Sequence, residues 1–309
     1  MIDFQGLRRE YQDLVAVRDL QLSIPEGEVF GLIGPNGAGK TTLIRMACGL
    51  LTPTSGNVTI AGIDVHQNPE LAQSHIGYLS DFFSVYDDLK VWEYLDYFAR
   101  AYKLDAAAIP ARVDEVIDEI GLEVKRDSMV KGLSRGMKQR LGIGRAVIHR
   151  PKLLLLDEPA SGLDPKARIE LRQLLKRLRD NGATIVVSSH ILPDLEGFST
   201  SIGVMERGVM LRSGRVQELR DEVEAGDART IDIRWLGPSA VVSGFLRAHG
   251  LTQHALLDRE GAFQFRGDDQ AVGDLLAEMT AAGIRLTSFH EVKQTVEELY
   301  LKLSHGQVM

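Results

Sequence analysis

The strongest constraint on this chain is a glycine-rich loop at residues 34–41, placed between an apolar run and a helical pattern. The loop consists of Gly34, Pro35, Asn36, Gly37, Ala38, Gly39, Lys40 and Thr41. This order matches the pattern G-x-x-x-x-G-K-[ST], in which glycines let consecutive backbone N–H groups face inward as a nest for an anion. A helix that begins at Lys40 adds the positive end of its dipole. The pattern predicts a phosphate-binding loop in which Lys40 reaches the β- and γ-phosphates and the Thr41 hydroxyl ligates Mg²⁺.

Two apolar runs favour this interpretation over an isolated glycine-rich turn. The first, residues 29–33 (VFGLI), ends directly before the loop and is typical of a buried strand. The second, residues 153–156 (LLLL), ends in Asp157 and Glu158. Carboxylates there lie at the sheet edge beside the loop, where Asp157 can hold Mg²⁺ and Glu158 can polarise the attacking water. Alone, the acidic pair would indicate an ordinary solvated strand end; together with the loop it indicates a hydrolytic site.

The other patterns of the first two thirds predict an α/β core. Residues 40–50 have helical spacing, and the residues of about 82–150 are mostly helical. A helical stretch at 165–180 and a strand at 184–188 follow the second apolar run, which is typical of a parallel βαβ unit. We expect one α/β domain over residues 1–220, with its helical part at about 82–150. A linker is expected at residues 221–228, which open with the acidic stretch DEVEAGD.

The pattern of strands and helices restarts after the linker. Segments in the order βαββαβ lie at residues 229–235, 239–249, 254–258, 262–266, 268–282 and 285–290. This order predicts a small ferredoxin-like α+β domain over residues 229–309, with a helical tail at 295–303. The segment carries no phosphate loop and no carboxylate pair at catalytic spacing, so we expect it to do no chemistry.

Three further segments stand in order with the loop and the acidic strand end. They read LSRGMKQR at residues 133–140, SGLD at 161–164 and SSH at 188–190. Together the five motifs resemble the ATP-binding cassette (ABC) ATPases, the nucleotide-binding subunits of ABC transporters, over about residues 1–220. The resemblance implies a P-loop NTPase (ABC ATPase) core with an antiparallel β subdomain and a helical signature subdomain. It also implies ATP and Mg²⁺ as cofactors.

The resemblance assigns roles to individual residues. It makes Glu158 and His190 catalytic and places Asp164 in the D-loop. The residues that would bind ATP are Tyr11, stacked on adenine, and the loop residues from Gly34 to Lys40, Thr41 and Thr42. The signature residues that would contact the ATP of a second subunit are Leu133, Ser134, Arg135, Gly136 and Met137. The implied assembly is a dimer, and we expect a homodimer.

Three positions depart from the usual pattern of this family: Asp81, Arg135, and Met137, which stands where glutamine is common. The loop that joins the subdomains usually carries glutamine, whereas this chain has Asp81 after the sequence YLS. Aspartate can still ligate Mg²⁺, so the expected metal ligands are Thr41, Asp81 and Asp157. The signature has Arg135 where glycine is common, and two interpretations stay open: Arg135 adds positive charge near the γ-phosphate, or it faces solvent.

Charge and hydropathy limit the partners. The net charge of −7 and the pI of about 5.7 disfavour binding to nucleic acid. No apolar run approaches the about 18–20 residues of a membrane span. A transport function therefore requires multi-span membrane permease subunits in separate chains, with this chain cytoplasmic and peripheral on the inner face of the cell membrane. The aromatic segment at residues 81–86 (DFFSVY) either packs in the helical part or contacts such a permease.

The sequence thus predicts the ATP-binding and ATP-hydrolysing subunit of an ABC-type membrane transporter, driven by ATP-dependent dimerisation. Residues 291–300 (EVKQTVEELY) also resemble the tail of bacterial exporter ATPases, so we expect an exporter with a separate permease. One alternative is a soluble ABC-type ATPase that acts on ribosomes or DNA. The single cassette, the lack of an inserted coiled coil and the acidic pI disfavour it. Another is a regulator that only binds nucleotide, which Glu158 and His190 disfavour.

Overall fold

The computed structural model describes residues 1–12, 14–191, 194–195, 197–219, 229–251, 253–257 and 259–292. Two units are distinct in it, one built on Met1–Val216 and one that begins at Gln217. The expected linker at 221–228 and the expected helical tail at 295–303 lie outside the described residues. Within the described part of the chain, no helix has the length and apolar character needed to cross a membrane.

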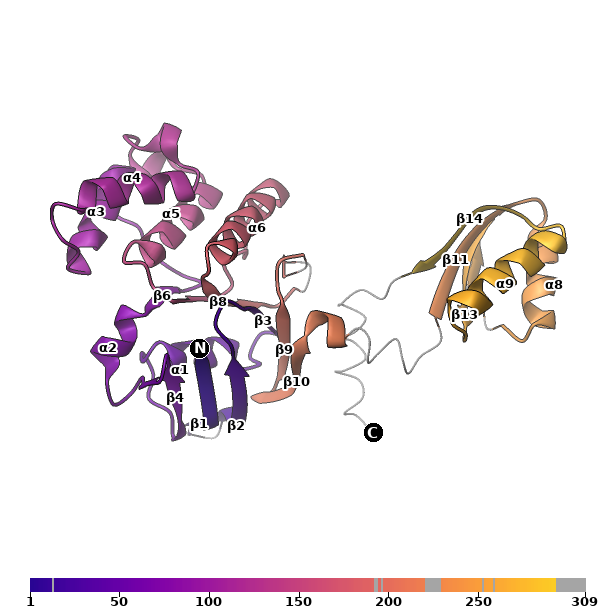
Figure 1. Ribbon diagram of the computed structural model, residues 1–309, viewed down its shortest axis with the longest axis horizontal. Coiled ribbons are helices and arrows are strands. Elements are labelled where there is room, and N and C mark those ends of the chain that lie inside the picture. The colour runs from indigo at the N-terminus through magenta and orange to yellow at the C-terminus, as the bar shows by residue number, and fades with distance from the viewer. Residues whose placement is uncertain are drawn as a thin grey trace. The chain divides into compact units, whose positions relative to one another are not determined.

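A six-stranded sheet in the order β10-β9-β3-β8-β7-β6 forms the centre of the first unit (Figure 1). Its strands are β3 (Val29–Ile33), β6 (Ile76–Leu79), β7 (Leu153–Leu156), β8 (Thr184–Ser189), β9 (Ser201–Glu206) and β10 (Val209–Arg215). All neighbours pair in parallel except β9 and β10, which are antiparallel. Every residue of β3, β7 and β8 is buried, as expected for central parallel strands with both faces covered. The strands predicted from the two apolar runs are confirmed.

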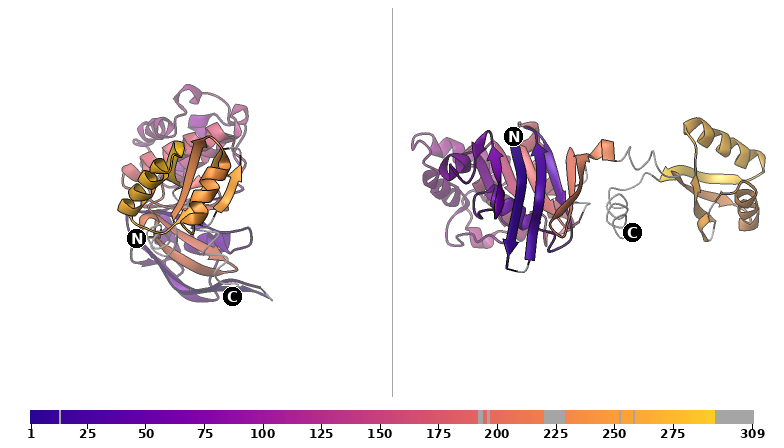
Figure 2. Two further views of the ribbon diagram at one scale, coloured as in Figure 1. Left: turned by 90° about the vertical axis from the view of Figure 1, so that its right-hand side faces the viewer. Right: turned by 90° about the horizontal axis from the view of Figure 1, so that it is seen from below.

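A second, antiparallel sheet in the order β2-β1-β4-β5 lies beside the first helix. Its strands are β1 (Ile2–Tyr11), β2 (Leu14–Ile24), β4 (Ser55–Ile60) and β5 (Ile63–Asp64); β1 and β2 run side by side in Figure 2. One hydrophobic cluster joins Phe4 of this sheet, Ile44 of helix α1 (Lys40–Ala47) and Leu155 of β7. Helix α1 is therefore fixed by apolar contacts to both sheets, and the loop that precedes it has a rigid support.

Helix α1 is shorter than the predicted span of residues 40–50. Gly49 has a left-handed φ of 70°, and the N–H of Leu50 donates to the carbonyl of Arg45 at 2.9 Å. This arrangement ends a helix, because only glycine adopts that conformation without strain.

The remaining helices of the first unit lie on the parallel sheet or form a separate helical part (Figure 1). They are α2 (Pro69–Ser74), α3 (Val91–Ala101), α4 (Ile109–Glu119), α5 (Arg135–Val147) and α6 (Pro165–Asp180). The expected helical part at about 82–150 contains α3, α4 and α5. Helix α6 has the predicted bounds, because Asp164 caps its N-terminus by accepting a hydrogen bond from Ala167 N and proline follows at the first helical position.

The second unit has the order β11 (Arg229–Leu236), α8 (Ser239–Ala248), β12 (Gln253–Leu257), β13 (Glu260–Phe265), α9 (Asp269–Ala281) and β14 (Arg285–Val292). Its antiparallel sheet runs β12-β13-β11-β14, which confirms the ferredoxin-like pattern. Both helices pack on one face, where Val242 and Met279 contact the cluster around Trp235 (Figure 2). The hairpin turn is tighter than predicted, since Glu260 already pairs with Leu257.

Candidate nucleotide-binding and hydrolysis site

The glycine-rich loop lies between β3 and α1, and its glycines are required by close backbone contacts. A Cβ on Gly34 would lie 2.1 Å from the carbonyl oxygen of Met205, and one on Gly39 would lie 2.3 Å from that of Ala16. Gly37 and Gly39 also have left-handed φ values of 81° and 105°. The loop is therefore held between the end of β9 and strand β2, in a shape that other residues would disrupt.

The N-terminus of α1 is open for an anion. Its N-cap residue, Gly39, offers no side-chain cap, and its first turn holds no acidic residue. The helix N–H groups and the positive end of the dipole are thus uncompensated by the protein, which suits a phosphate group. The loop itself is stabilised from outside by a hydrogen bond from Gly208 N to the carbonyl of Ala38, 2.9 Å long.

Lys40 is buried directly beneath the loop, with 5% of its surface exposed. Its Nζ donates to the carbonyls of Gly34 at 2.6 Å and Pro35 at 3.2 Å. The same ammonium lies 3.3 Å from Oε1 of Glu158. The structure therefore brings the predicted phosphate-binding lysine together with the predicted catalytic carboxylate.

Asp157 and Glu158 follow β7, and Ser188 of β8 connects them. Ser188 Oγ donates to Asp157 Oδ1 at 2.7 Å and accepts a hydrogen bond from Glu158 N at 2.9 Å. Asp157 is 1% exposed, and among the described residues no hydrogen bond is recorded to its second carboxylate oxygen, which suits another ligand. No separate role was predicted for Ser188. The signal was the position of the SSH motif at the end of a strand parallel to β7, which puts the two strand ends together.

Glu158 is held in an unusual conformation. Its φ is +48°, which non-glycine residues rarely adopt. Its Oε2 lies 2.7 Å from His190 Nδ1 and accepts a second hydrogen bond from His190 N at 3.3 Å. Oε1 is buried and accepts no hydrogen bond from the described residues, and Lys40 is its counter-ion. A carboxylate fixed in this way by His190 can orient a water molecule and accept its proton.

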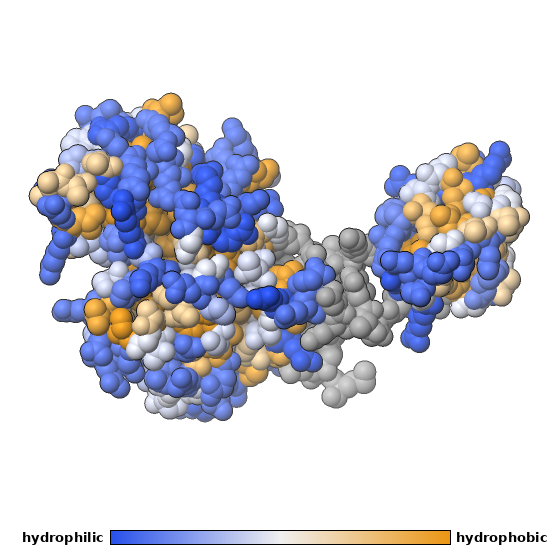
Figure 3. Space-filling model, in the orientation of Figure 1, coloured by the Kyte–Doolittle hydropathy of each residue, from blue (hydrophilic) through white to orange (hydrophobic). Residues whose placement is uncertain are grey.

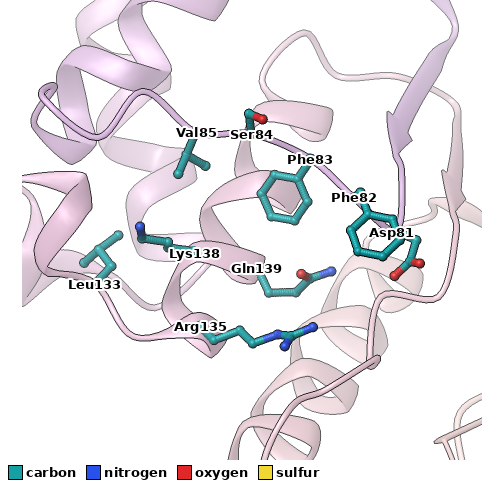
Figure 4. Close-up of a pocket in the computed structure, with 9 residues that line it drawn as sticks. All are labelled: Asp81, Phe82, Phe83, Ser84, Val85, Leu133, Arg135, Lys138 and Gln139. Atoms are coloured by element: carbon teal, nitrogen blue, oxygen red, sulfur yellow. The ribbon is translucent and has the colours of Figure 1, made fainter.

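Asp81 follows β6 and lines an open hollow of about 540 Å³, together with Phe83, Arg135 and Gln139 (Figure 4). Partial burial raises the pKa of the Asp81 carboxyl above its usual value. The negative charges of the acidic pair at the end of β7 raise this pKa further, and the positive charge of Arg135 opposes the rise. Asp81 therefore interacts electrostatically with the carboxylates of the hydrolytic site.

The signature residues begin helix α5. Ser134 is its N-cap and accepts a hydrogen bond from Met137 N at 3.3 Å. Gly136 is buried, and a Cβ there would lie 2.7 Å from Ala167 Cβ of α6. Among the described residues, no hydrogen bond or ion pair links residues 133–137 to the phosphate loop of the same chain. Arg135 is exposed, and its Nη2 donates to the carbonyl of Ser161 at 3.0 Å, so both interpretations of this residue stay predictions.

Tyr11 ends β1, and its ring is 40% exposed. The guanidinium of Arg9 lies 4.6 Å over the ring centroid. An exposed aromatic ring can stack on a base, so adenine stacking remains a prediction for this residue.

The residues fit a magnesium ion that is bound mainly through substrate and water. The described residues contain no group of three or more His, Cys, Asp or Glu side chains suited to a metal ion. Mg²⁺ typically keeps several waters and binds one or two carboxylates plus substrate phosphates. The free oxygen of Asp157 and the Thr41 hydroxyl in the first turn of α1 are ligands of that kind.

Comparisons with known proteins relate the chain to one family. Residues 17–161 match the family model described as ABC transporter. The linearmycin resistance ATP-binding protein LnrL of Bacillus subtilis is 30% identical over 98% of each chain. The Nod factor export ATP-binding protein I of Rhizobium meliloti is 34% identical, over 98% of this chain and 88% of the relative. A solved dimeric ATP-binding cassette in a post-hydrolysis state, bound to ADP and Pi, is 26% identical with a TM-score of 0.63 and covers 70% of this chain and 99% of that one.

This chain belongs to the ATP-binding proteins of ABC transporters. It binds and hydrolyses ATP to power a membrane transporter, as the five sequence motifs predicted. The alternative of an ATPase that acts on ribosomes or DNA is not favoured.

Proposed function

We propose that this chain powers export through separate, multi-span permease subunits, as a homodimer at the inner face of the cell membrane. The observation that carries the proposal is the similarity along the whole chain, second unit included, to ATP-binding proteins named for drug resistance and for export. The relatives have nearly the same extent as this chain, which supports a division of the transporter into separate ATPase and permease chains.

The test of export is vectorial transport. The tagged chain is produced with the multi-span protein encoded next to it, and inside-out vesicles are prepared. ATP-dependent uptake of a labelled substrate into these vesicles supports export. Uptake that occurs only in right-side-out vesicles supplied with internal ATP contradicts it. The Glu158→Gln variant serves as the inactive control.

ATP binding in the proposed mechanism rests on the loop and on Lys40. Loop N–H groups and the N-terminus of α1 hold the phosphates, and Lys40 exchanges the carboxylate of Glu158 for β- and γ-phosphate oxygens. Thr41, Asp157 and Asp81 would hold Mg²⁺, whose positive charge would offset that of the β- and γ-phosphates.

Glu158 orients the attacking water and accepts its proton. Its carboxylate keeps the contact with His190, which fixes the direction in which the oxygens point. The charge of Lys40 no longer neutralises Glu158 once phosphate has replaced it. ATP binding thereby frees the base for its role, and the empty subunit keeps the base neutralised.

Dimerisation in the proposed mechanism uses the signature helix. Helix α5 has no acidic residue in its first turn, so its N-terminus at Ser134 presents uncompensated positive potential. The phosphate of a partner subunit's ATP is the group that would satisfy it. Hydrolysis removes this bridging charge and separates the subunits.

The permease-facing surface is proposed to lie around Phe82. This ring is 89% exposed, whereas Phe83 packs against Gly142 of α5, where a Cβ would lie 2.7 Å from the ring. Phe83 therefore fits the interpretation of packing in the helical part, whereas exposed Phe82 is available for contact with a permease. Nearby, exposed Tyr86 and Tyr97 line a second hollow of about 570 Å³. Apolar areas of this kind interrupt a mostly hydrophilic exterior (Figure 3).

The second unit is proposed to steady or regulate the dimer without doing chemistry. Of its described histidine side chains, His249 stacks on Phe245 with ring centroids 4.0 Å apart, and Nδ1 of His290 lies 3.1 Å from Ser288 Oγ on the sheet. A chain truncated after Val216 should keep ATP binding and change dimerisation or transport. Loss of nucleotide binding in a well-folded truncated chain would overturn this division of roles.

A further inference from the structure

The side chain of Arg135 connects the signature helix to the loop that follows the catalytic carboxylate. Its Nη2 donates to the carbonyl of Ser161 at 3.0 Å. A Cβ on the next residue, Gly162, would lie 2.5 Å from the guanidinium carbon and from both terminal nitrogens of Arg135. The guanidinium therefore lies directly against the backbone of Gly162. In Figure 4 the Arg135 side chain extends from the start of α5 along the floor of the hollow.

Ser161 in turn closes the backbone turn that starts at Glu158. Ser161 N donates to the carbonyl of Glu158 at 3.0 Å. Glu158 has the left-handed φ of +48°, a strained conformation that persists only where the surroundings hold it. Ser188 holds the start of this turn through Glu158 N. The hydrogen bond from Arg135 holds its other end, at the carbonyl of Ser161.

We propose that Arg135 is a positioning residue for ATP hydrolysis, acting through the Ser161 carbonyl on the turn that aims the Glu158 carboxylate. The inference rests on the proposed role of Glu158. A planar guanidinium can lie flat on Gly162 and donate to Ser161 at the same time, which a lysine ammonium cannot reproduce fully. The proposed contact lies within one subunit. A direct contact of Arg135 with the ATP of a partner subunit is a different role, and the two roles predict different changes in kcat and KM.

The first test is steady-state ATP hydrolysis by the full chain. Arg135→Ala should lower kcat by about tenfold, the order expected for one charge-assisted hydrogen bond, with the KM for ATP within about twofold of the original. Arg135→Lys should recover part of the loss. If Arg135 instead binds the partner's ATP, Arg135→Ala raises KM and weakens ATP-dependent dimerisation, and the inference is overturned.

A double-mutant cycle tests the path through the turn. Gly162→Ala introduces a methyl group that displaces the guanidinium from Ser161, and it also adds backbone strain. The strain is the same with or without Arg135, so it cancels in the cycle. Gly162→Ala should therefore lower kcat further in the original chain than in the Arg135→Ala chain. Equal fold-losses in the two backgrounds contradict the inference.

Arg177 provides a matched control. Its Nη2 also donates to a single backbone carbonyl, that of Glu119 at 3.2 Å, but at a place remote from the turn. Arg177→Ala should leave kcat unchanged, and a loss equal to that of Arg135→Ala would refute a specific role. Glu158→Gln is measured alongside. If it keeps full turnover, the assigned role of Glu158 fails and the inference falls with it. If it is inactive while Arg135→Ala is normal, only the inference fails.

Discussion

Lys40 and Glu158 form an ion pair with 3.3 Å between Nζ and Oε1, and their side chains are only 6% and 12% exposed. Each side chain neutralises the charge of the other at a place that water hardly reaches. Removing one member of such a pair leaves a buried charge uncompensated, which typically costs about 3–5 kcal/mol. The pair therefore stabilises the empty site. ATP must separate the two groups when it binds, so its phosphates must replace the lost contact.

Lys40→Ala should reduce ATP affinity or turnover more than tenfold. The ammonium makes charge-assisted contacts to phosphate, worth about 1.5–3 kcal/mol, that no neutral side chain replaces. Isothermal titration with ATP and a phosphate-release assay measure the two quantities. Lys176→Ala, a change at an exposed lysine of α6, is the control. Unchanged binding and hydrolysis in Lys40→Ala would show that phosphate is held elsewhere.

Glu158→Gln should bind ATP, stop hydrolysing it and accumulate as a closed dimer. Glutamine keeps the shape of the side chain but cannot accept a proton from water. Light scattering with ATP should show a doubled mass that is absent without nucleotide. His190→Ala should also lose most turnover while it still binds ATP, because Glu158 Oε2 loses its 2.7 Å partner. A monomeric Glu158→Gln chain with normal turnover would contradict both the role and the dimer.

Asp81→Asn should raise the Mg²⁺ concentration needed for half-maximal hydrolysis. The change removes one anionic oxygen from the proposed metal site while the size of the side chain is kept. Titration of activity with Mg²⁺ at saturating ATP measures the shift. An unchanged Mg²⁺ dependence would mean that Asp81 is a solvated loop residue, and the hollow beside Arg135 would then have no part in metal binding.

Stability should fall with acidity through His149. Burial lowers the pKa of His149 from its usual value to about 4. Its Nε2 donates to the carbonyl of Ile76 at 3.0 Å, so Nδ1 carries no proton; Nδ1 is buried and has no hydrogen-bond partner among the described residues. Protonation would place a second N–H there with no acceptor.

The sign of this effect follows from the lowered pKa. Between about pH 6.5 and 4, His149 is protonated in the unfolded chain and neutral in the folded chain. The free energy of unfolding is therefore highest above pH 6.5 and decreases as the pH falls through this range. His149→Gln, which can still donate to Ile76, should lose less free energy of unfolding between pH 7 and pH 5 than the original chain. Urea unfolding at both pH values measures the difference. Parallel losses in the two chains would exclude His149 as the cause.

Elements whose limits depend on adjacent residues were predictable from the sequence. Four leucines followed by an acidic pair define β7, and helix α6 starts where Asp164 caps it and Pro165 follows. The phosphate loop was predictable for the same reason, because its glycines and Lys40 are consecutive. Local chemistry decides such features before any tertiary contact forms.

The contacts that complete the site join residues far apart in the sequence, and the individual hydrogen bonds among them were not predicted. Ser188 reaches Asp157 only because β8 lies parallel to β7 with Val187 opposite Leu156. The partner of Arg135 is a backbone carbonyl, which any residue carries and no motif marks. The sequence therefore left the direction of the Arg135 side chain open, although it located the helix that carries it.

Part of the backbone that packs against the phosphate loop, here called its wall, lies far along the chain: Met205 and Gly208 contact Gly34 and Ala38. At translation rates of about 5–20 residues per second, roughly ten to thirty seconds separate the synthesis of the loop from that of its wall. During that interval β3 also lacks its neighbours β8 and β9. The nascent chain thus carries a phosphate-binding sequence without a phosphate-binding site. We therefore expect the subunit to bind nucleotide only after nearly all of the first unit has been made.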